Sequence, residues 1–475
     1  MKSIYTLILF FLFCAPILWA QNPNPNPALD NFILDEMTAE RLPGLSTVMV
    51  KDGEIVWLES YGMANFETNT PVSDSTIFLL ASVSKLFTAT AAMQLVEQGI
   101  LDLDVSINEY LPFIVEHPTS FIPITARMLL THTASIRDNF GAMNNYYAFG
   151  DPVLSLGEVI ERYFNVNGED FDANQNFYTA EPGTDYQYTN MGIALLGYLV
   201  EVLSESPFSD HTIENQFSPL CMNDTRWYLS ELDTILVARP YTTQGTSYIP
   251  IAHYSFADYP NGLLRSSVLD LAQWMVTYLE EGQLGSVEML SPNTIQSMWS
   301  PHISSIEPTQ GLVWYQEELF LDNGGSAFLW GHNGGEAGTS TDIYFDPENN
   351  LALAILANGE GTNLFIADAL YNYGLTLEAT GTMELACVLS SAQTLDSAVD
   401  PVITLGPNPT DGWLHIRSKG FEGSVGKVFN ALGQLVAEKE EIWSEWSIYL
   451  SAPGSYTVQI IAHGSQSWSK IVIRN

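Results

Sequence analysis

Ser82 and Lys85, three positions apart, are the two side chains in this sequence best suited to covalent chemistry. Apolar residues recur at helical spacing between positions 82 and 98, and Gly99 follows, so the pattern predicts one amphipathic helix that begins at Ser82. The hydroxyl and the amine then share a helix face, at the end where free N–H groups favour a developing anion. A lysine whose pKa is lowered by burial can take the proton of a serine nucleophile.

The Ser-x-x-Lys pattern alone is weak evidence, because it occurs three times. The other two pairs, Ser424/Lys427 and Ser467/Lys470, lie in strand-like sequence near the C-terminus. We interpret them as ordinary surface residues, since polar and basic side chains usually face solvent. Only the pair at Ser82 opens a helix rich in small residues.

Tyr188 and Asn190 form a second candidate element, in a predicted loop after Pro182-Gly183. A tyrosine near a lysine can have its pKa lowered and can pass the serine proton to a leaving group. An asparagine can bind a substrate carbonyl. The spacing recurs at Tyr163/Asn165 and at Tyr259/Asn261, so hydrogen-bonded loop residues are the alternative interpretation.

The third element is the stretch Gly331-His-Asn-Gly-Gly335, directly after an apolar strand. Glycines there allow a substrate to lie along the strand edge and leave a backbone N–H free for an oxyanion. The alternative for His332 is a structural histidine that is hydrogen-bonded inside the fold.

The elements around these motifs predict an α+β fold. Strand patterns occur at both ends of residues 21–375, and helical patterns lie between them, so we expect an antiparallel sheet built from both ends, with an inserted helical region. The predicted strands are 46–50, 54–58, 328–330, 340–345 and 351–357, and the predicted helices include 156–163, 191–203, 211–217, 269–280 and 364–371. Residues 137–180 are expected to form an irregular surface insertion.

Composition divides the rest of the chain. Residues 1–20 predict a secretory signal peptide cleaved after Ala20, with a membrane anchor as the alternative, and no later stretch is apolar enough to span a bilayer. Residues 376–400 are expected to be a linker, and the short β runs of 401–475 predict a small β-sandwich. The two remaining cysteines, Cys221 and Cys387, are expected to be free or buried thiols.

Charge and missing motifs exclude several functions. Residues 21–375 carry 45 acidic and 9 basic residues, a net charge of −36, which repels polyanions and argues against nucleic-acid binding. The sequence has no Gly-x-Ser-x-Gly elbow of an α/β-hydrolase and no clustered His/Asp metal pattern. We therefore expect no metal and no cofactor.

In this order, the three elements resemble the serine β-lactamase and penicillin-binding-protein superfamily, specifically its class C-like branch. The resemblance spans roughly residues 30–375 and includes the phrases 78–85, 129–133 and 188–192. It implies that Ser82 is acylated, that Lys85 and Tyr188 share acid/base work, and that Asn190 contacts the substrate. It also implies that Gly334 and Gly335 line the substrate, with the N–H groups of Ser82 and Gly335 as the oxyanion hole.

In this resemblance His332 takes the place of the lysine of the third motif in true β-lactamases, which puts β-lactam hydrolysis in doubt. The expected substrate is an ester or amide, either a small molecule or a peptide, and this class includes D-amino-acid peptides and β-lactams. The alternative is a catalytically silent protein that binds a peptide or penicillin in the same pocket.

The C-terminal module resembles the type IX secretion sorting domain of Bacteroidetes. The resemblance rests on Pro407-Asn-Pro409, the turn 431–435, the strand 454–458 and the basic β run at the end. It implies the type IX secretion machinery as a partner, and a protein that passes through the periplasm and is then secreted or held at the outer-membrane surface. The alternative is a generic adhesion or carbohydrate-binding sandwich.

Overall fold

The computed structural model describes residues 22–379 and seven strands between 402 and 474. It divides into two units, Met1–Ser391 and Ala392–Asn475. The predicted signal peptide, most of the predicted linker and Cys387 lie outside the described residues.

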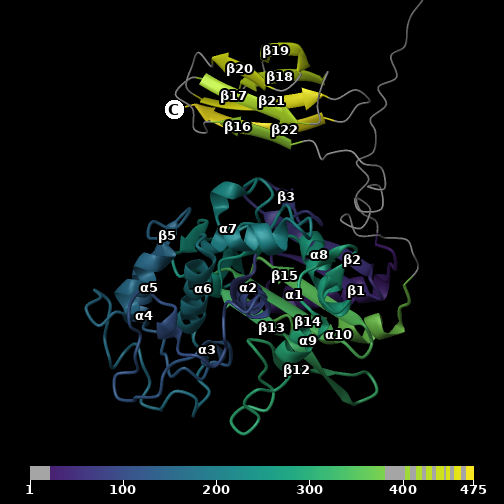
Figure 1. Ribbon diagram of the computed structural model, residues 1–475. Coiled ribbons are helices and arrows are strands. Elements are labelled where there is room, and N and C mark those ends of the chain that lie inside the picture. Colours follow the sequence, from purple (N-terminus) through teal and green to yellow (C-terminus); the bar gives the residue numbers. More distant parts are fainter. Residues whose placement is uncertain are drawn as a thin grey trace, which may run out of the picture. The chain divides into compact units, whose positions relative to one another are not determined.

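A seven-stranded antiparallel sheet forms the centre of the first unit (Figure 1). Its strand order is β12-β13-β14-β15-β1-β2-β3. The strands are β1 (Gly44–Lys51), β2 (Glu54–Asn65), β3 (Thr70–Pro71), β12 (Tyr315–Phe320), β13 (Ser326–Glu336), β14 (Thr339–Asp346) and β15 (Leu351–Ala357). Because β1 pairs with β15, strands from the two ends of the unit meet inside the sheet. The predicted α+β class is confirmed.

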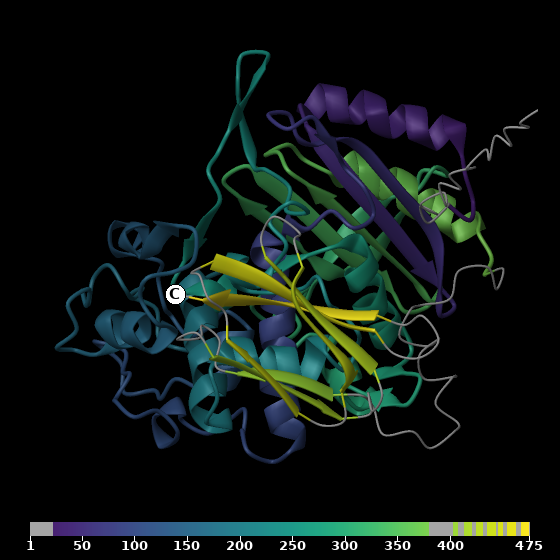
Figure 2. The same cartoon turned by 90° about the horizontal axis from the view of Figure 1, so that it is seen from above.

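Helices cover both faces of this sheet. They are α1 (Pro27–Glu40), α2 (Ser84–Glu97), α3 (Ala126–Leu130), α4 (Phe140–Met143), α5 (Leu156–Phe164), α6 (Asn190–Ser204), α7 (Phe208–Thr212), α8 (Val268–Leu279), α9 (Pro292–Met298) and α10 (Leu364–Thr376). On one face, α1 and α10 bury apolar residues against β1 and β15 (Figure 2). On the other face, α8 and the inserted helices pack against the alternate residues of the same strands.

Alternation along β15 shows why both faces are covered. Ala352, Ala354 and Leu356 belong to the core under α8, whereas Leu353 and Ile355 belong to the core under α1 and α10. A strand with apolar residues on both sides is stable only when both sides are packed. The continuous apolar run in the sequence therefore marks a central strand.

Shorter strands complete the first unit. They are β4 (Phe78–Leu79), β5 (Tyr147–Phe149), β6 (Tyr241–Gln244), β7 (Ser247–Pro250), β8 (Tyr254–Phe256), β9 (Arg265–Ser266), β10 (Gln283–Leu284) and β11 (Val287–Glu288). No single helix in the described part of the chain is long and apolar enough to cross a bilayer, although the bent pair Asn190–Ser204 and Phe208–Phe217 meets the criteria of length and composition together.

Four expectations about this unit need correction. The helix at Ser82 is not amphipathic: it starts as a 3₁₀ turn, η1 (Ala81–Val83), and α2 is buried on every side as far as Leu95. The insertion 137–180 is not purely superficial, because Tyr163 and Phe177 lie in the core. The glycine-rich stretch after Trp330 belongs to β13 itself. Cys221 is disulfide-bonded, so it is not a free thiol.

The second unit has two antiparallel sheets, as expected for the predicted β-sandwich. The strand order is β16-β17-β20 in one sheet and β19-β18-β21-β22 in the other. The strands are β16 (Val402–Gly406), β17 (Trp413–Lys419), β18 (Ser424–Asn430), β19 (Leu435–Ile442), β20 (Glu445–Tyr449), β21 (Gly454–Ile461) and β22 (Ser467–Arg474). Strand β16 was not predicted from the sequence.

Candidate active site

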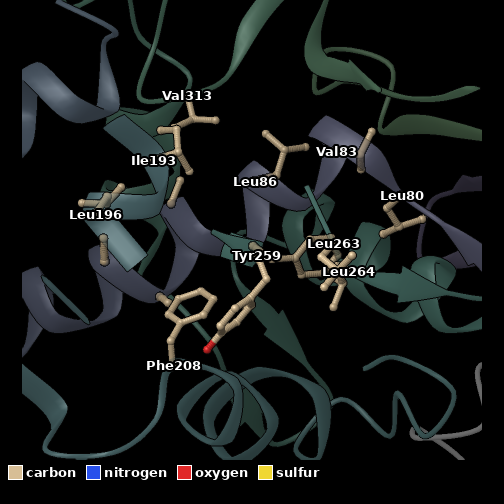
Figure 3. Close-up of a cluster of buried hydrophobic side chains, with 14 of the residues drawn as sticks. Leu80, Val83, Leu86, Ile193, Leu196, Phe208, Tyr259, Leu263, Leu264 and Val313 are labelled. Atoms are coloured by element: carbon tan, nitrogen blue, oxygen red, sulfur yellow. The ribbon is translucent and has the colours of Figure 1, made fainter. Parts of the chain in front are cut away.

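Ser82 is held in a fixed position by its neighbours on both sides. Ala81 adopts a left-handed backbone conformation (φ +46°), which is unusual for a residue with a side chain and typical of strained functional turns. The carbonyl of Leu80 accepts a hydrogen bond from the Thr341 hydroxyl of β14 (2.7 Å). Figure 3 shows Leu80 and Val83 in the surrounding cluster of buried hydrophobic side chains. Ser82 itself is half-buried.

Lys85 lies one helical turn after Ser82 and is completely buried. Its Nζ donates to Ser82 Oγ (2.9 Å) and to the carbonyl of Asn261 (2.5 Å). Burial lowers the pKa of Lys85 to about 7, against the opposing effect of Asp138, Glu336 and other carboxylates nearby. At neutral pH a large fraction of this amine is therefore uncharged and can accept the Ser82 proton.

Tyr188 completes a hydrogen-bonded group with these two residues. Its hydroxyl is hydrogen-bonded to Ser82, and its ring centroid lies 5.0 Å from Lys85 Nζ. The expected lowering of the phenol pKa is wrong. Loss of hydration raises the pKa of Tyr188 well above its usual value. Tyr188 is therefore protonated at neutral pH.

Asn190 is the first residue of α6, and its side chain donates a hydrogen bond to Asp138. Asp138 accepts hydrogen bonds from the backbone N–H groups of Asn190 and Met191, from the Thr189 hydroxyl (2.9 Å) and from Asn190 Nδ2 (2.9 Å). This arrangement caps the helix that follows Tyr188. The predicted contact of Asn190 with substrate stays a prediction. The capping role of Asp138 was missed, because the residue lies about 50 positions before the helix it caps.

Strand β13 brings His332, Gly334 and Gly335 to the edge of the nucleophile segment. A Cβ atom at Gly334 would lie 2.5 Å from the carbonyl oxygen of Leu80 and 3.1 Å from the backbone nitrogen of Ser82, so only glycine fits there. Gly335 has open space beside it. The close approach at Gly334 therefore fixes β13 against Ser82.

His332 is buried and uncharged. Its Nδ1 donates to the carbonyl of Asn333 (2.5 Å), and Nε2 has no partner among the described residues. Burial, with the nearby charge of Lys85, lowers the pKa of His332 to about 3. The side chain therefore carries no positive charge at neutral pH.

His132 is a neighbour of this group that was not identified from the sequence. Its ring centroid lies 4.6 Å from that of Tyr188, and its Nδ1 accepts a hydrogen bond from the N–H of Thr189 (3.4 Å). It has a left-handed backbone (φ +54°) and is buried, and burial lowers its pKa. The phrase 129–133 contained this residue, but its chemistry gave no separate signal.

Comparison with known proteins identifies the main unit. The β-lactamase family model matches residues 29–378. The chain belongs to the β-lactamase family. Its C-terminal unit matches the secretion system C-terminal sorting domain over residues 405–474, and such a domain points to secretion with cell-surface or outer-membrane association.

Individual members of the β-lactamase family are distant in sequence. Protein flp of Staphylococcus aureus is 22% identical over 334 residues, which cover 70% of this chain and 62% of flp. A penicillin-binding protein homologue from Pyrococcus abyssi superposes with a TM-score of 0.59 at 22% identity, over 93% of this chain and 99% of that one. A class C β-lactamase gives 0.58 at 20% identity, over 74% and 96%. These structural likenesses confirm the β-lactamase-type fold.

The candidate site opens into a cavity of about 420 Å³. The cavity is lined by Ser82, His132, Tyr186, Tyr188, Glu307, Thr309, Gln310, Val313, Tyr315, His332 and Asn333. Three of the predicted site residues, Ser82, Tyr188 and His332, therefore line the same cavity. Asn190 does not line it, and Gly334 and Gly335 line a neighbouring hollow of about 590 Å³. Among the described residues, no group of three or more His, Cys, Asp or Glu side chains could hold a metal ion.

Proposed function

We propose that this β-lactamase-family chain is a hydrolase that cleaves an ester or amide through an acyl-enzyme on Ser82. The observation that carries the proposal is the 2.9 Å contact between Ser82 Oγ and a buried Lys85 whose pKa is about 7. A neutral amine at hydrogen-bond distance from a serine hydroxyl is the arrangement that activates this nucleophile.

The acylation step follows from these contacts. Ser82 Oγ attacks the substrate carbonyl carbon while its proton passes to Lys85 Nζ. The backbone N–H groups of Ser82 and Gly335 stabilise the oxyanion. Collapse of the tetrahedral intermediate breaks the bond to the leaving group, which takes the proton of Tyr188, and Lys85 returns a proton to Tyr188. Water then attacks the acyl group by the same route and releases the acid.

The wall of the cavity favours substrates without a carboxylate. His332 is neutral, Lys85 is buried, and no Lys or Arg is among the described residues that line the cavity. A substrate carboxylate would lose its hydration there without gaining a cationic partner. We therefore place uncharged esters and amides ahead of β-lactams and D-amino-acid peptides with a free carboxylate.

Covalent labelling tests the proposal. A fluorophosphonate probe should label the wild type at Ser82, found by peptide mapping, and should not label the Ser82→Ala variant. Ser75→Ala, a half-buried serine outside the cavity, is the matched control and should retain labelling. Labelling that persists in Ser82→Ala would contradict the proposal.

A chromogenic ester distinguishes the enzyme from the silent binding protein. An enzyme gives a burst of one product per site followed by continued turnover. A burst without turnover would instead favour a protein that binds and retains its ligand in the same pocket.

Localisation forms a second part of the proposal. We propose that the chain enters the periplasm by a signal peptide at residues 1–20 and crosses the outer membrane with the type IX machinery, as in Bacteroidetes. The match of residues 405–474 to a secretion sorting domain supports this route.

A further inference from the structure

One carboxylate, Glu307, faces the cavity that contains Ser82. Its Oε1 accepts hydrogen bonds from the Thr309 hydroxyl (2.7 Å) and the Thr309 N–H (3.3 Å), which fix its orientation. No described residue donates to its Oε2, and no described cation forms an ion pair with it. The wall therefore holds an oriented negative charge without a counter-ion.

An aromatic ring lines the same cavity as this carboxylate. It belongs to Tyr186, which is half-buried. Burial and then the charge of Glu307 raise the pKa of Tyr186 to about 12, which places the two side chains within electrostatic reach of each other. A carboxylate next to a tyrosine ring attracts cations in two ways, by charge and through the face of the ring.

We propose that Glu307 and Tyr186 bind a cationic group, an ammonium or quaternary ammonium, in the acyl part of the substrate. This inference rests on the proposed function, and it names the class of substrate that the site selects. The acyl group enters with its carbonyl at Ser82, and its distal end reaches the wall formed by Glu307, Tyr186 and Thr309. The cation supplies the partner that Glu307 Oε2 lacks.

A general attraction for cations must be distinguished from this local contact, because residues 21–375 carry a net charge of −36. Attraction by the whole surface is screened at about 1 M salt, where the Debye length is about 3 Å, whereas a partly buried pair is screened much less. Measurements at high salt therefore isolate the contribution of Glu307.

Two esters of equal shape provide the experiment. They are the 4-nitrophenyl esters of 4-(trimethylammonio)butanoic acid and of 5,5-dimethylhexanoic acid, which differ only in a charged nitrogen against a neutral carbon. At about 1 M NaCl, the wild type should show a ratio of kcat/KM that favours the cationic ester by about tenfold. Glu307→Gln keeps the size of the side chain and should bring the ratio close to one.

Glu318→Gln is the matched control, because Glu318 is exposed on β12 and does not line the cavity. This variant should keep the wild-type ratio. The inference is overturned if the wild type shows no preference, if the preference survives in Glu307→Gln, or if Glu318→Gln loses it equally.

A measurement on the wild type alone does not depend on the folding of a variant. Tetramethylammonium should inhibit hydrolysis of the neutral ester competitively, and equal concentrations of tert-butanol should inhibit at least about tenfold less. Equal inhibition by both would overturn the inference. Hydrolysis of both esters by Ser82→Ala would instead refute the proposed function, so the two failures are distinguishable.

Discussion

The buried amine of Lys85 gives the reaction a defined pH dependence. Its pKa of about 7 means that the neutral, proton-accepting form is lost as the pH falls below 7, so kcat/KM for a neutral ester should rise with pH through this value. The charge of Glu336 favours the protonated amine, so Glu336→Gln should lower the pKa of Lys85. The rising limb of the pH–rate profile should then move to lower pH. A pH–rate profile measures both effects.

The exposed residue Glu318 again provides the control for that profile. Glu318→Gln removes the same charge from the neighbouring strand β12 and should leave the limb in place. If the limb stays fixed in Glu336→Gln, or moves to higher pH, Lys85 is not the group that titrates.

We expect His332 to determine the charge beside the reacting bond. With a pKa of about 3, it stays neutral across the working pH range. His332→Lys should raise the ratio of kcat/KM for a cephalosporin over that for a neutral ester by about tenfold, which is about 1.4 kcal/mol. A wild type that already prefers the cephalosporin, or a ratio that does not change, would contradict this role.

Two adjacent glycines of β13 allow a test at the level of secondary structure elements. Gly334→Ala would place a Cβ against the backbone of Leu80 and Ser82, so it should lower the free energy of unfolding by about 1–3 kcal/mol and slow acylation. Gly335→Ala enters open space and should leave the melting temperature unchanged. Calorimetry of the two variants measures the difference, and equal losses of stability would show that the close approach is not the cause.

Helices and strands with strong local signals could be predicted from the sequence, and contacts between distant segments could not. The strands 46–50, 54–58 and 351–357 were correctly predicted, because alternation and apolar runs are local features. By contrast, the apolar periodicity of Met191 to Leu203 predicts a helix but not that Asp138 caps it.

In the candidate site, too, local patterns could be predicted from the sequence and contacts between distant segments could not. The Ser82/Lys85 pair is a local pattern on one helical turn, and the structure brings Tyr188 to it. His132 and Glu307 reach the cavity through loops whose paths depend on tertiary packing. The direction of the Tyr188 pKa shift was mispredicted for a related reason, because the effect of burial, which raises this pKa, outweighs the effect of the hydrogen bond to Ser82, which lowers it.

At the scale of the whole molecule, the two units should have separable functions. The end of α10 is tied to β1, since Lys51 Nζ donates to the carbonyls of Gly374 (3.1 Å) and Leu377 (2.6 Å). A chain that ends at Ser391, the last residue of the first unit, should keep the proposed hydrolytic activity in vitro and remain in the periplasm of its host. An insoluble or inactive truncated protein would contradict this independence, and fractionation of the host cells measures the location.

The pairing of β1 with β15 also determines when this chain can fold. Met49 pairs with Leu353, so about 300 residues must be available before the central pair of strands can form. Until then the β1–β2 hairpin has an open edge and two unpaired apolar faces, a state that favours aggregation. A nascent chain therefore cannot complete its central sheet until β15 has been synthesised, and we expect chaperones to protect the first strands until then.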